Sequence, residues 1–137
     1  MAAVARLRDS ALIGTLVYTI LLVILLVAPL SAPHVHRGYL MEFRLPIGRR
    51  LIADVAVNIA IFAPLGWGLH RSARRLDLGP STRFLVVVGS AAAFSLAMET
   101  VQYWLPGRYS SIVDVAVNTV GAAVGAWTEA RMGNRLR

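Results

Sequence analysis

Two copies of one five-residue sequence carry polar residues whose types and spacing could support binding chemistry. Residues 54–58 and 114–118 are both Asp-Val-Ala-Val-Asn, and each copy opens an apolar stretch. Side chains four residues apart lie above one another on a helix, so Asp54 would pair with Asn58, and Asp114 with Asn118. A carboxylate beside an amide can bind hydroxyl, amine or amide groups. We therefore treat both pairs as candidate binding residues.

A third polar pair adds a further carboxylate. Glu99 and Gln102 are three residues apart and would share one helical face. From the rise per residue, Asp54, Glu99 and Asp114 would each lie about 6 to 9 Å inside the ends of their helices, so we predict one polar layer. Arg49, Arg50 and Arg108 would lie on the same side of the membrane as this layer and could hold a phosphate there. A carboxylate crowded by like charges could act as a general acid or base, but the sequence has no recognised catalytic motif and leaves an enzymatic role open.

A purely structural role is the alternative for these polar groups. Polar side chains hydrogen-bond helices to one another inside membranes. Amides alone would serve that purpose, whereas carboxylates facing lipid are costly. Three carboxylates therefore favour a functional site. Its predicted members are Asp54, Asn58, Glu99, Gln102, Arg108, Asp114 and Asn118.

The composition predicts that the elements carrying these residues cross a membrane. The chain is 57% hydrophobic and its mean hydropathy is +0.63, which is too apolar for an ordinary soluble domain. We predict an all-α fold, a single domain over residues 1–137, built as a four-transmembrane-helix bundle. The spans are expected at about 11–30, 51–69, 84–105 and 110–129. The first could instead be a signal peptide, but its apolar run is long for one and favours a retained helix.

The longest connection, residues 31–50, is predicted to be an external loop, and its role stays open. His34 and His36 lie in it, but two histidines two residues apart in a loop are more often solvated than metal ligands. We therefore predict no metal and no cofactor. The chain has no cysteine, which excludes disulfides and thiolate metal sites.

The distribution of arginine predicts the orientation in the membrane. All fourteen basic residues are arginine, and with a cytoplasmic N-terminus nine of them lie on the cytoplasmic side. The positive-inside rule therefore places both termini in the cytoplasm. The formal net charge of +7 would suggest nucleic acid as a partner of a soluble protein. Here membrane lipid accounts for that charge, so no nucleic-acid partner is predicted.

The repeated pentad also predicts an arrangement of helices. Two helical hairpins would form a degenerate parallel repeat, so that both Asp-Asn pairs enter the bilayer from the same side. Gly121 and Gly125 form a G-x-x-x-G pattern that lets another helix approach closely. In the other copy, Pro64 and Gly66 predict a kinked or weakened helix, because proline removes a backbone hydrogen bond.

These motifs together resemble the VanZ-like family of small bacterial membrane proteins. The segment from Asp54 to Gly66 has the pattern D-x-x-x-N-I-x-x-F-x-P-L-G. It is followed by E-x-x-Q at Glu99, by Arg108, and by D-x-x-x-N from Asp114, and the resemblance covers about residues 51–127. The resemblance implies a multi-pass protein of the bacterial plasma membrane. The family's named member is associated with resistance to the glycopeptide teicoplanin, although membership does not by itself confer antibiotic resistance.

Three functions from different classes follow. The first is binding or modification of an anionic cell-envelope component at an outward-facing site, with a lipid-linked precursor, a phospholipid head group or a glycopeptide as the ligand. The second is a small transporter or channel, which is disfavoured because the inner halves of the spans are apolar. The third is a structural partner, either in a homo-oligomer or bound to another membrane protein.

Overall fold

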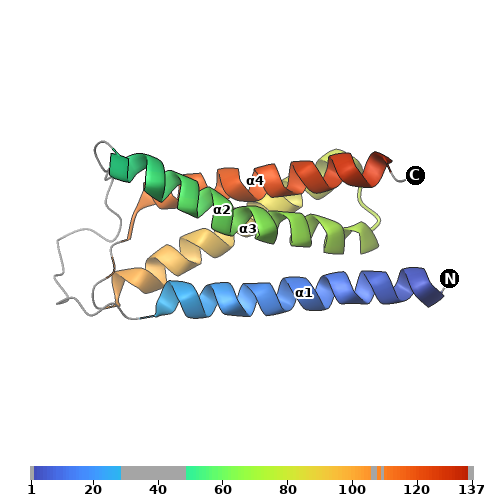
Figure 1. Cartoon of the computed structure of the whole chain (residues 1–137), viewed down its shortest axis with the longest axis horizontal. Coiled ribbons are helices and arrows are strands. Elements are labelled where there is room, and N and C mark those ends of the chain that lie inside the picture. Colours follow the sequence, from blue (N-terminus) through green and yellow to red (C-terminus); the bar gives the residue numbers. More distant parts are fainter. Residues whose placement is uncertain (1, 29–48, 106–107, 109, 136–137) are drawn as a thin grey trace.

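The computed structural model describes residues 2–28, 49–105, 108 and 110–135. Four long helices make up almost all of it (Figure 1). They are α1 (Ala2–Val27), α2 (Arg49–Ser72), α3 (Pro80–Tyr103) and α4 (Ile112–Arg135), with a single 3-10 turn, η1 (Ala73–Arg75), after α2. The predicted loop 31–50, with His34 and His36, lies outside the described residues except for its last two positions. The all-α prediction is confirmed.

The helix boundaries differ from the predicted spans for local reasons. α1 ends at Val27 instead of residue 30, before the two prolines that follow. α3 begins at Pro80 instead of residue 84, because proline is favoured in the first helical turn and the N–H of Arg83 already bonds to the carbonyl of Gly79. α4 continues past Glu129 to Arg135. α2 runs through Pro64 as one helix.

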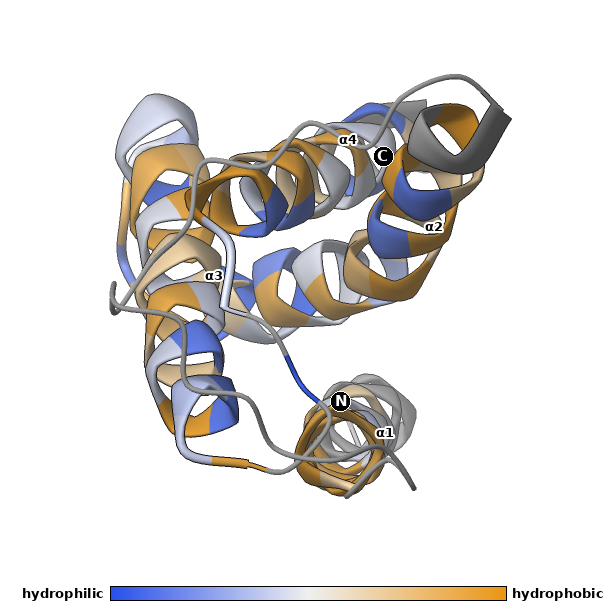
Figure 2. Ribbon diagram, turned by 90° about the vertical axis from the view of Figure 1, so that its left-hand side faces the viewer, coloured by the Kyte–Doolittle hydropathy of each residue, from blue (hydrophilic) through white to orange (hydrophobic). Residues whose placement is uncertain are grey.

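The helices pack as a close group of three with α1 beside it (Figure 2). α2 and α4 make the most extensive contact and run in the same direction, while α3 packs mainly on α4 (Figure 1). α1 contacts α2 and α3. Apolar packing is centred on Leu22, Phe62 and Leu65, and the rings of Phe62 and Phe94 lie 6.2 Å apart.

Three of the four helices that the structure describes are long and apolar enough to cross a membrane. The stretches are Ser10–Val27, Ile52–Arg75 and Pro80–Tyr103. Their outward side chains are apolar, as expected for surfaces that contact lipid; Ile13, Ile52 and Leu85 are each more than 60% exposed. α4 has the same 24-residue length as α2 and α3 but is less apolar, because it carries Asp114, Glu129 and Arg131. The start of α1 and the end of α4 lie at the same end of the bundle (Figure 1).

Candidate functional site

The predicted site residues gather where four helix termini meet. The end of α1, the start of α2, the end of α3 and the start of α4 lie together at one end of the bundle (Figure 1). We call the seven residues there the polar layer: Asp54, Asn58, Glu99, Gln102, Arg108, Asp114 and Asn118. The layer lies at the end away from the start of α1.

The two Asp-Asn pairs meet because α2 and α4 are neighbours. The side-chain nitrogen of Asn58 donates to Oδ1 of Asp114 across a distance of 3.3 Å. Asp54 is exposed, and its charge acts on Asp114. The amide of the first copy therefore binds the carboxylate of the second, and the first carboxylate remains at the surface.

Glycine brings the backbones of α2 and α4 close enough for that contact. A Cβ atom added at Gly121 would lie 2.9 Å from the Cα of Ile59. One added at Gly125 would overlap the carbonyl of Ala63, and one added at Gly66 would overlap the carbonyl of Ala122. All three glycines are buried. The helices thus touch through backbone atoms, as small-residue interfaces in membranes do.

Glu99 is the most deeply buried carboxylate of the polar layer. It is 4% exposed, and its Oε2 accepts the backbone N–H of Ser111 at 2.8 Å. That N–H belongs to the residue before α4, where helices leave backbone donors without an internal partner. The charges of Asp114 and Arg108 both act on Glu99. Glu99 therefore joins α3 to the start of α4 while remaining in the middle of the polar layer.

Gln102 and Arg108 bind the end of α1. Nε2 of Gln102 donates to the carbonyl of Leu26 at 3.1 Å. Nη2 of Arg108 donates to the carbonyl of Leu25 at 2.9 Å, and both Nε and Nη2 donate to the carbonyl of Ala28, at 3.2 and 3.1 Å. These carbonyls are left without helical partners where α1 ends, so both side chains satisfy them. Arg108 was predicted to hold a phosphate; in the structure, its Nε and Nη2 already donate to carbonyls at the end of α1.

Buried oxygens extend the layer inward. Asn118 is 3% exposed and its amide nitrogen donates to Oγ of Ser95 at 2.9 Å. Within the described residues, Oδ1 of Asn118 and the hydroxyls of Ser110 and Ser111 are buried without a hydrogen-bond partner. Sequence reasoning missed these three serines. The position of Ser95, four residues before Glu99 and hence on the same helical face, was a usable signal.

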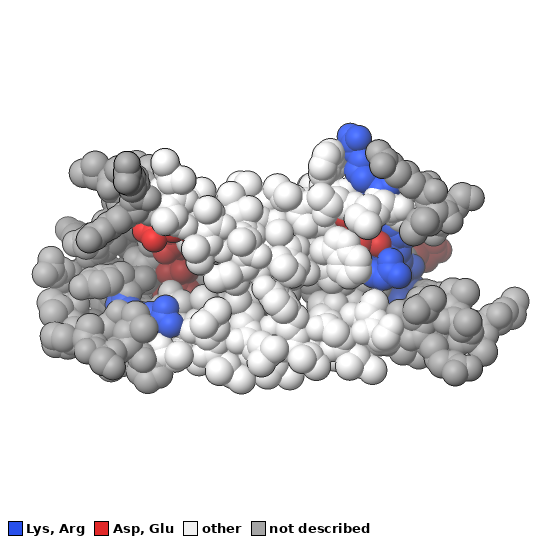
Figure 3. Space-filling view, in the orientation of Figure 1, with Lys and Arg blue, Asp and Glu red and all other residues white. Residues whose placement is uncertain are grey.

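A second charged group lies at the opposite end of the bundle and was also missed. Nδ1 of His70 and Oε2 of Glu129 are 2.6 Å apart, and Nε of Arg74 lies 3.0 Å from the other carboxylate oxygen of Glu129. Arg71 is 3.6 Å from the same oxygen. Glu129 is only 1% exposed. We call these four residues the His70–Glu129 cluster. Charged side chains gather at the two ends with an uncharged middle between them (Figure 3).

Comparison with known proteins identifies one family. The sequence model of the VanZ/LLP1 family matches residues 15–130, well over half of the chain. The match includes all seven residues of the polar layer and the His70–Glu129 cluster. No curated protein and no solved structure matches the chain.

Proposed function

The chain belongs to the VanZ/LLP1 family and is a multi-pass membrane protein, and from this premise we propose that its polar layer binds a component of the bacterial cell envelope. The ligand is an anionic, lipid-linked molecule whose hydroxyl or amine groups donate hydrogen bonds to Asp54, Glu99 and Asp114. In this proposal α4 is the fourth span and both termini are cytoplasmic. The polar layer then faces the outside of the plasma membrane.

The burial of Glu99 is the observation that carries the proposal. A carboxylate that is 4% exposed in a membrane-spanning helix is costly unless it is paired. Among the described residues, Glu99 accepts one hydrogen bond, from the backbone N–H of Ser111, although a carboxylate can accept about four. Buried oxygens of Asn118 and Ser110 lie in the same part of the fold. A bound group with several hydrogen-bond donors would satisfy these acceptors together, which simple helix association does not require.

The chemistry of the layer favours a donor-rich head group. Three carboxylates and one arginine leave the described part of the layer acidic, and Arg108 is engaged with α1. Amine, amide and hydroxyl groups of a lipid-linked precursor would bind Asp54 and Asp114 directly. Its phosphates would then lie nearer the membrane surface. Arg49 and Arg50 were predicted to help hold phosphate, and their side chains lie outside the described part of the chain.

The test compares Glu99→Gln and Asp114→Asn with the unaltered protein. Native mass spectrometry of the purified protein, titrated with a lipid-linked peptidoglycan precursor, phosphatidylethanolamine or a glycopeptide, would identify the ligand. Loss of a hydrogen bond to a charged group should weaken binding by roughly ten- to a hundredfold. Asp77→Asn is the matched control, because Asp77 is an exposed acid beyond the far end of α2. Equal affinity of all four proteins for every ligand tested would refute the proposal.

A transporter is less well supported by the packing. Phe62, Leu65, Ala122 and Ala126 are buried between the polar layer and the His70–Glu129 cluster. This apolar section separates the two charged ends, so an ion crossing the bundle would lose its polar partners midway. Uptake of a labelled substrate into proteoliposomes would reverse this preference.

Association with a second copy or another membrane protein stays a prediction, which crosslinking in intact membranes would test.

A further inference from the structure

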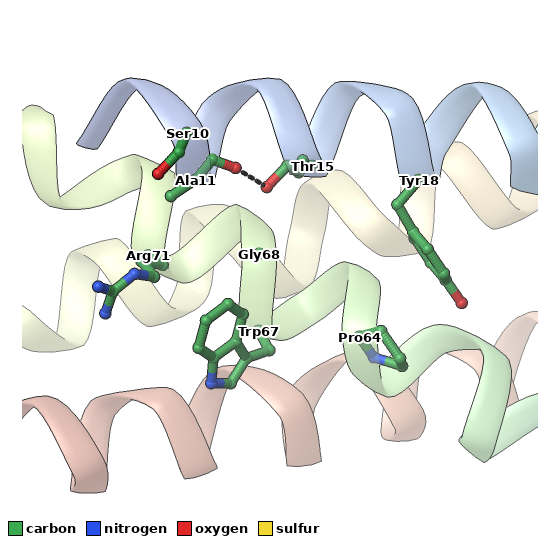
Figure 4. Close-up of a pocket in the computed structure, with 9 residues that line it drawn as sticks. Ser10, Ala11, Thr15, Tyr18, Pro64, Trp67, Gly68 and Arg71 are labelled. Atoms are coloured by element: carbon green, nitrogen blue, oxygen red, sulfur yellow. Dashed lines mark hydrogen bonds between the residues drawn. The ribbon is translucent and has the colours of Figure 1, made fainter. Parts of the chain in front are cut away.

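A groove between α1 and α2 lies at the end of the bundle opposite the polar layer. Its volume is about 360 Å³. Gly14 and Tyr18 of α1 line one side. The other side is lined by four residues of α2: Pro64, Trp67, Gly68 and Arg71 (Figure 4). We call it the α1–α2 groove. It does not depend on the ligand proposed for the polar layer.

The two helices touch beside the groove at Thr15 and at Tyr18, and leave open space at Gly14. A Cβ atom at Gly68 would lie 2.6 Å from Oγ1 of Thr15, so the helices are in close contact there. Further along, the hydroxyl of Tyr18 donates to the carbonyl of Ile61 at 2.6 Å. A Cβ atom at Gly14, in contrast, would meet nothing within 4 Å. The residues of α1 that line the groove run from Ser10 to Tyr18, so the groove follows the helix for a length on the order of 12 Å, given the rise per residue.

The position of the groove exposes it to lipid. Both of its walls belong to helices long and apolar enough to span the membrane, and the surrounding face of α1 is apolar, with Ile13 and Val17 exposed. A length on the order of 12 Å is most of one leaflet of a hydrocarbon core about 30 Å thick. If the groove were empty, the atoms that line it would lose van der Waals contacts. An acyl chain has the shape and polarity to fill it.

A positive charge at the mouth of the groove favours a lipid with an anionic head group. The side chain of Arg71 is 38% exposed, and its guanidinium lies 5.5 Å from the centre of the Trp67 ring. Arg74 makes the shorter contact with Glu129, at 3.0 Å against 3.6 Å for Arg71. Arg71 is thus the more weakly paired of the two and can also bind an anion. We propose that the α1–α2 groove binds one anionic phospholipid, with an acyl chain between the helices and its phosphate on Arg71.

The predicted orientation agrees with that ligand. The positive-inside rule places this end of the bundle at the cytoplasmic leaflet, where anionic lipids create a negative surface potential. A second arginine, Arg131, lies over Trp127 at the same end, with its guanidinium 4.5 Å from the ring centre. It does not line the groove, so it provides an internal control for charge alone.

Quenching of Trp67 fluorescence by brominated lipid tests the proposal directly. A variant carrying Trp104→Phe and Trp127→Phe leaves Trp67 as the single tryptophan, and both replaced side chains are exposed. The protein is placed in phosphatidylcholine vesicles that contain a small fraction of phospholipid with a brominated acyl chain, either phosphatidylglycerol or phosphatidylcholine. We expect apparent affinity for brominated phosphatidylglycerol to exceed that for brominated phosphatidylcholine by about fivefold, the effect of one arginine near a membrane surface.

Two pairs of variants separate the groove from general lipid contact. Gly14→Phe fills the groove and should abolish saturable quenching, whereas Gly89→Phe on α3, where an added Cβ also meets nothing within 4 Å, should not. Arg71→Gln should remove the preference for phosphatidylglycerol, whereas Arg131→Gln should keep it. Equal quenching by both lipids, unaffected by Gly14→Phe, would overturn the proposal. Loss of the preference in both arginine variants would also overturn it, because charge alone would then explain the binding.

Discussion

The buried Glu129 carboxylate gives the sharpest stability prediction. It joins α4 to α2 and η1 through His70 and Arg74, and it is one of the most deeply buried large side chains in the described structure. Replacing it with leucine keeps a similar volume and removes every polar contact. We therefore expect Glu129→Leu to be strongly destabilising, even though the substitution makes the bundle more apolar.

The size of the loss follows from the partners left behind. The imidazole of His70 is 4% exposed, so losing its 2.6 Å contact leaves a buried polar group unsatisfied, at a cost of about 1–3 kcal/mol. Arg74 is 21% exposed and can partly regain water, which limits its share to about 1 kcal/mol. The free energy of unfolding should therefore fall by about 2–4 kcal/mol. Glu129→Gln keeps an acceptor for His70 and should lose roughly half as much.

Reversible unfolding in mixed detergent micelles, followed by far-ultraviolet circular dichroism, measures these losses. Asp77→Asn is the control; Asp77 is an exposed acid at the same end of the bundle, and the change should stay within about 0.5 kcal/mol. A double-mutant cycle with His70→Leu should give a coupling energy of about 1–2 kcal/mol between His70 and Glu129. If Glu129→Leu unfolds at the midpoint of the Asp77→Asn control, the cluster does not stabilise the fold and the reasoning is wrong.

Two further perturbations address the packing of α4 and the end of α1. Gly125→Leu places side-chain atoms against the backbone of α2 and should lower the thermal midpoint and the yield of folded protein, whereas Gly89→Leu on α3 has open space and should match the unaltered protein. Arg108→Gln removes three hydrogen bonds to the end of α1. Hydrogen exchange followed by mass spectrometry in detergent should then speed up in the last turn of α1 but not in the middle of α3; unchanged exchange at α1 would contradict the assigned contact.

The sequence was sufficient to predict features that depend on residues of a single helix. Four helices follow from four apolar runs, and the spacing of Asp54 to Asn58 and of Asp114 to Asn118 was enough to place them on common faces. The hydrogen bond between Asn58 and Asp114 could not be predicted from spacing alone, because it depends on α2 and α4 being parallel neighbours. Whether that arrangement arose from a repeated hairpin stays a prediction.

Contacts between distant segments were beyond the reach of sequence patterns. His70 and Glu129 are 59 positions apart, one just after the predicted span 51–69 and the other at the end of the predicted span 110–129, and nothing in the sequence pairs them. In the sequence, Arg108 has no visible partner and was therefore predicted to bind phosphate. Its actual partners are carbonyl groups of α1, as is the partner of Gln102, and they lie more than 70 positions earlier in the chain. The unpaired carbonyl groups at a helix end belong to the backbone, so the sequence does not show which side chain will bind them. These partners can be identified only from the packed helices.

The parallel course of α2 and α4 has an electrical consequence. The peptide dipoles of two adjacent helices point the same way, so two amino ends, each with about half a positive elementary charge, lie side by side at one face, and two carboxyl ends with the opposite sign lie near the other. Asp114 falls in the first turn of α4, and His70 and Arg71 fall in the last turn of α2. The backbone of this pair therefore favours acids at one membrane face and bases at the other, before any ligand or lipid is bound.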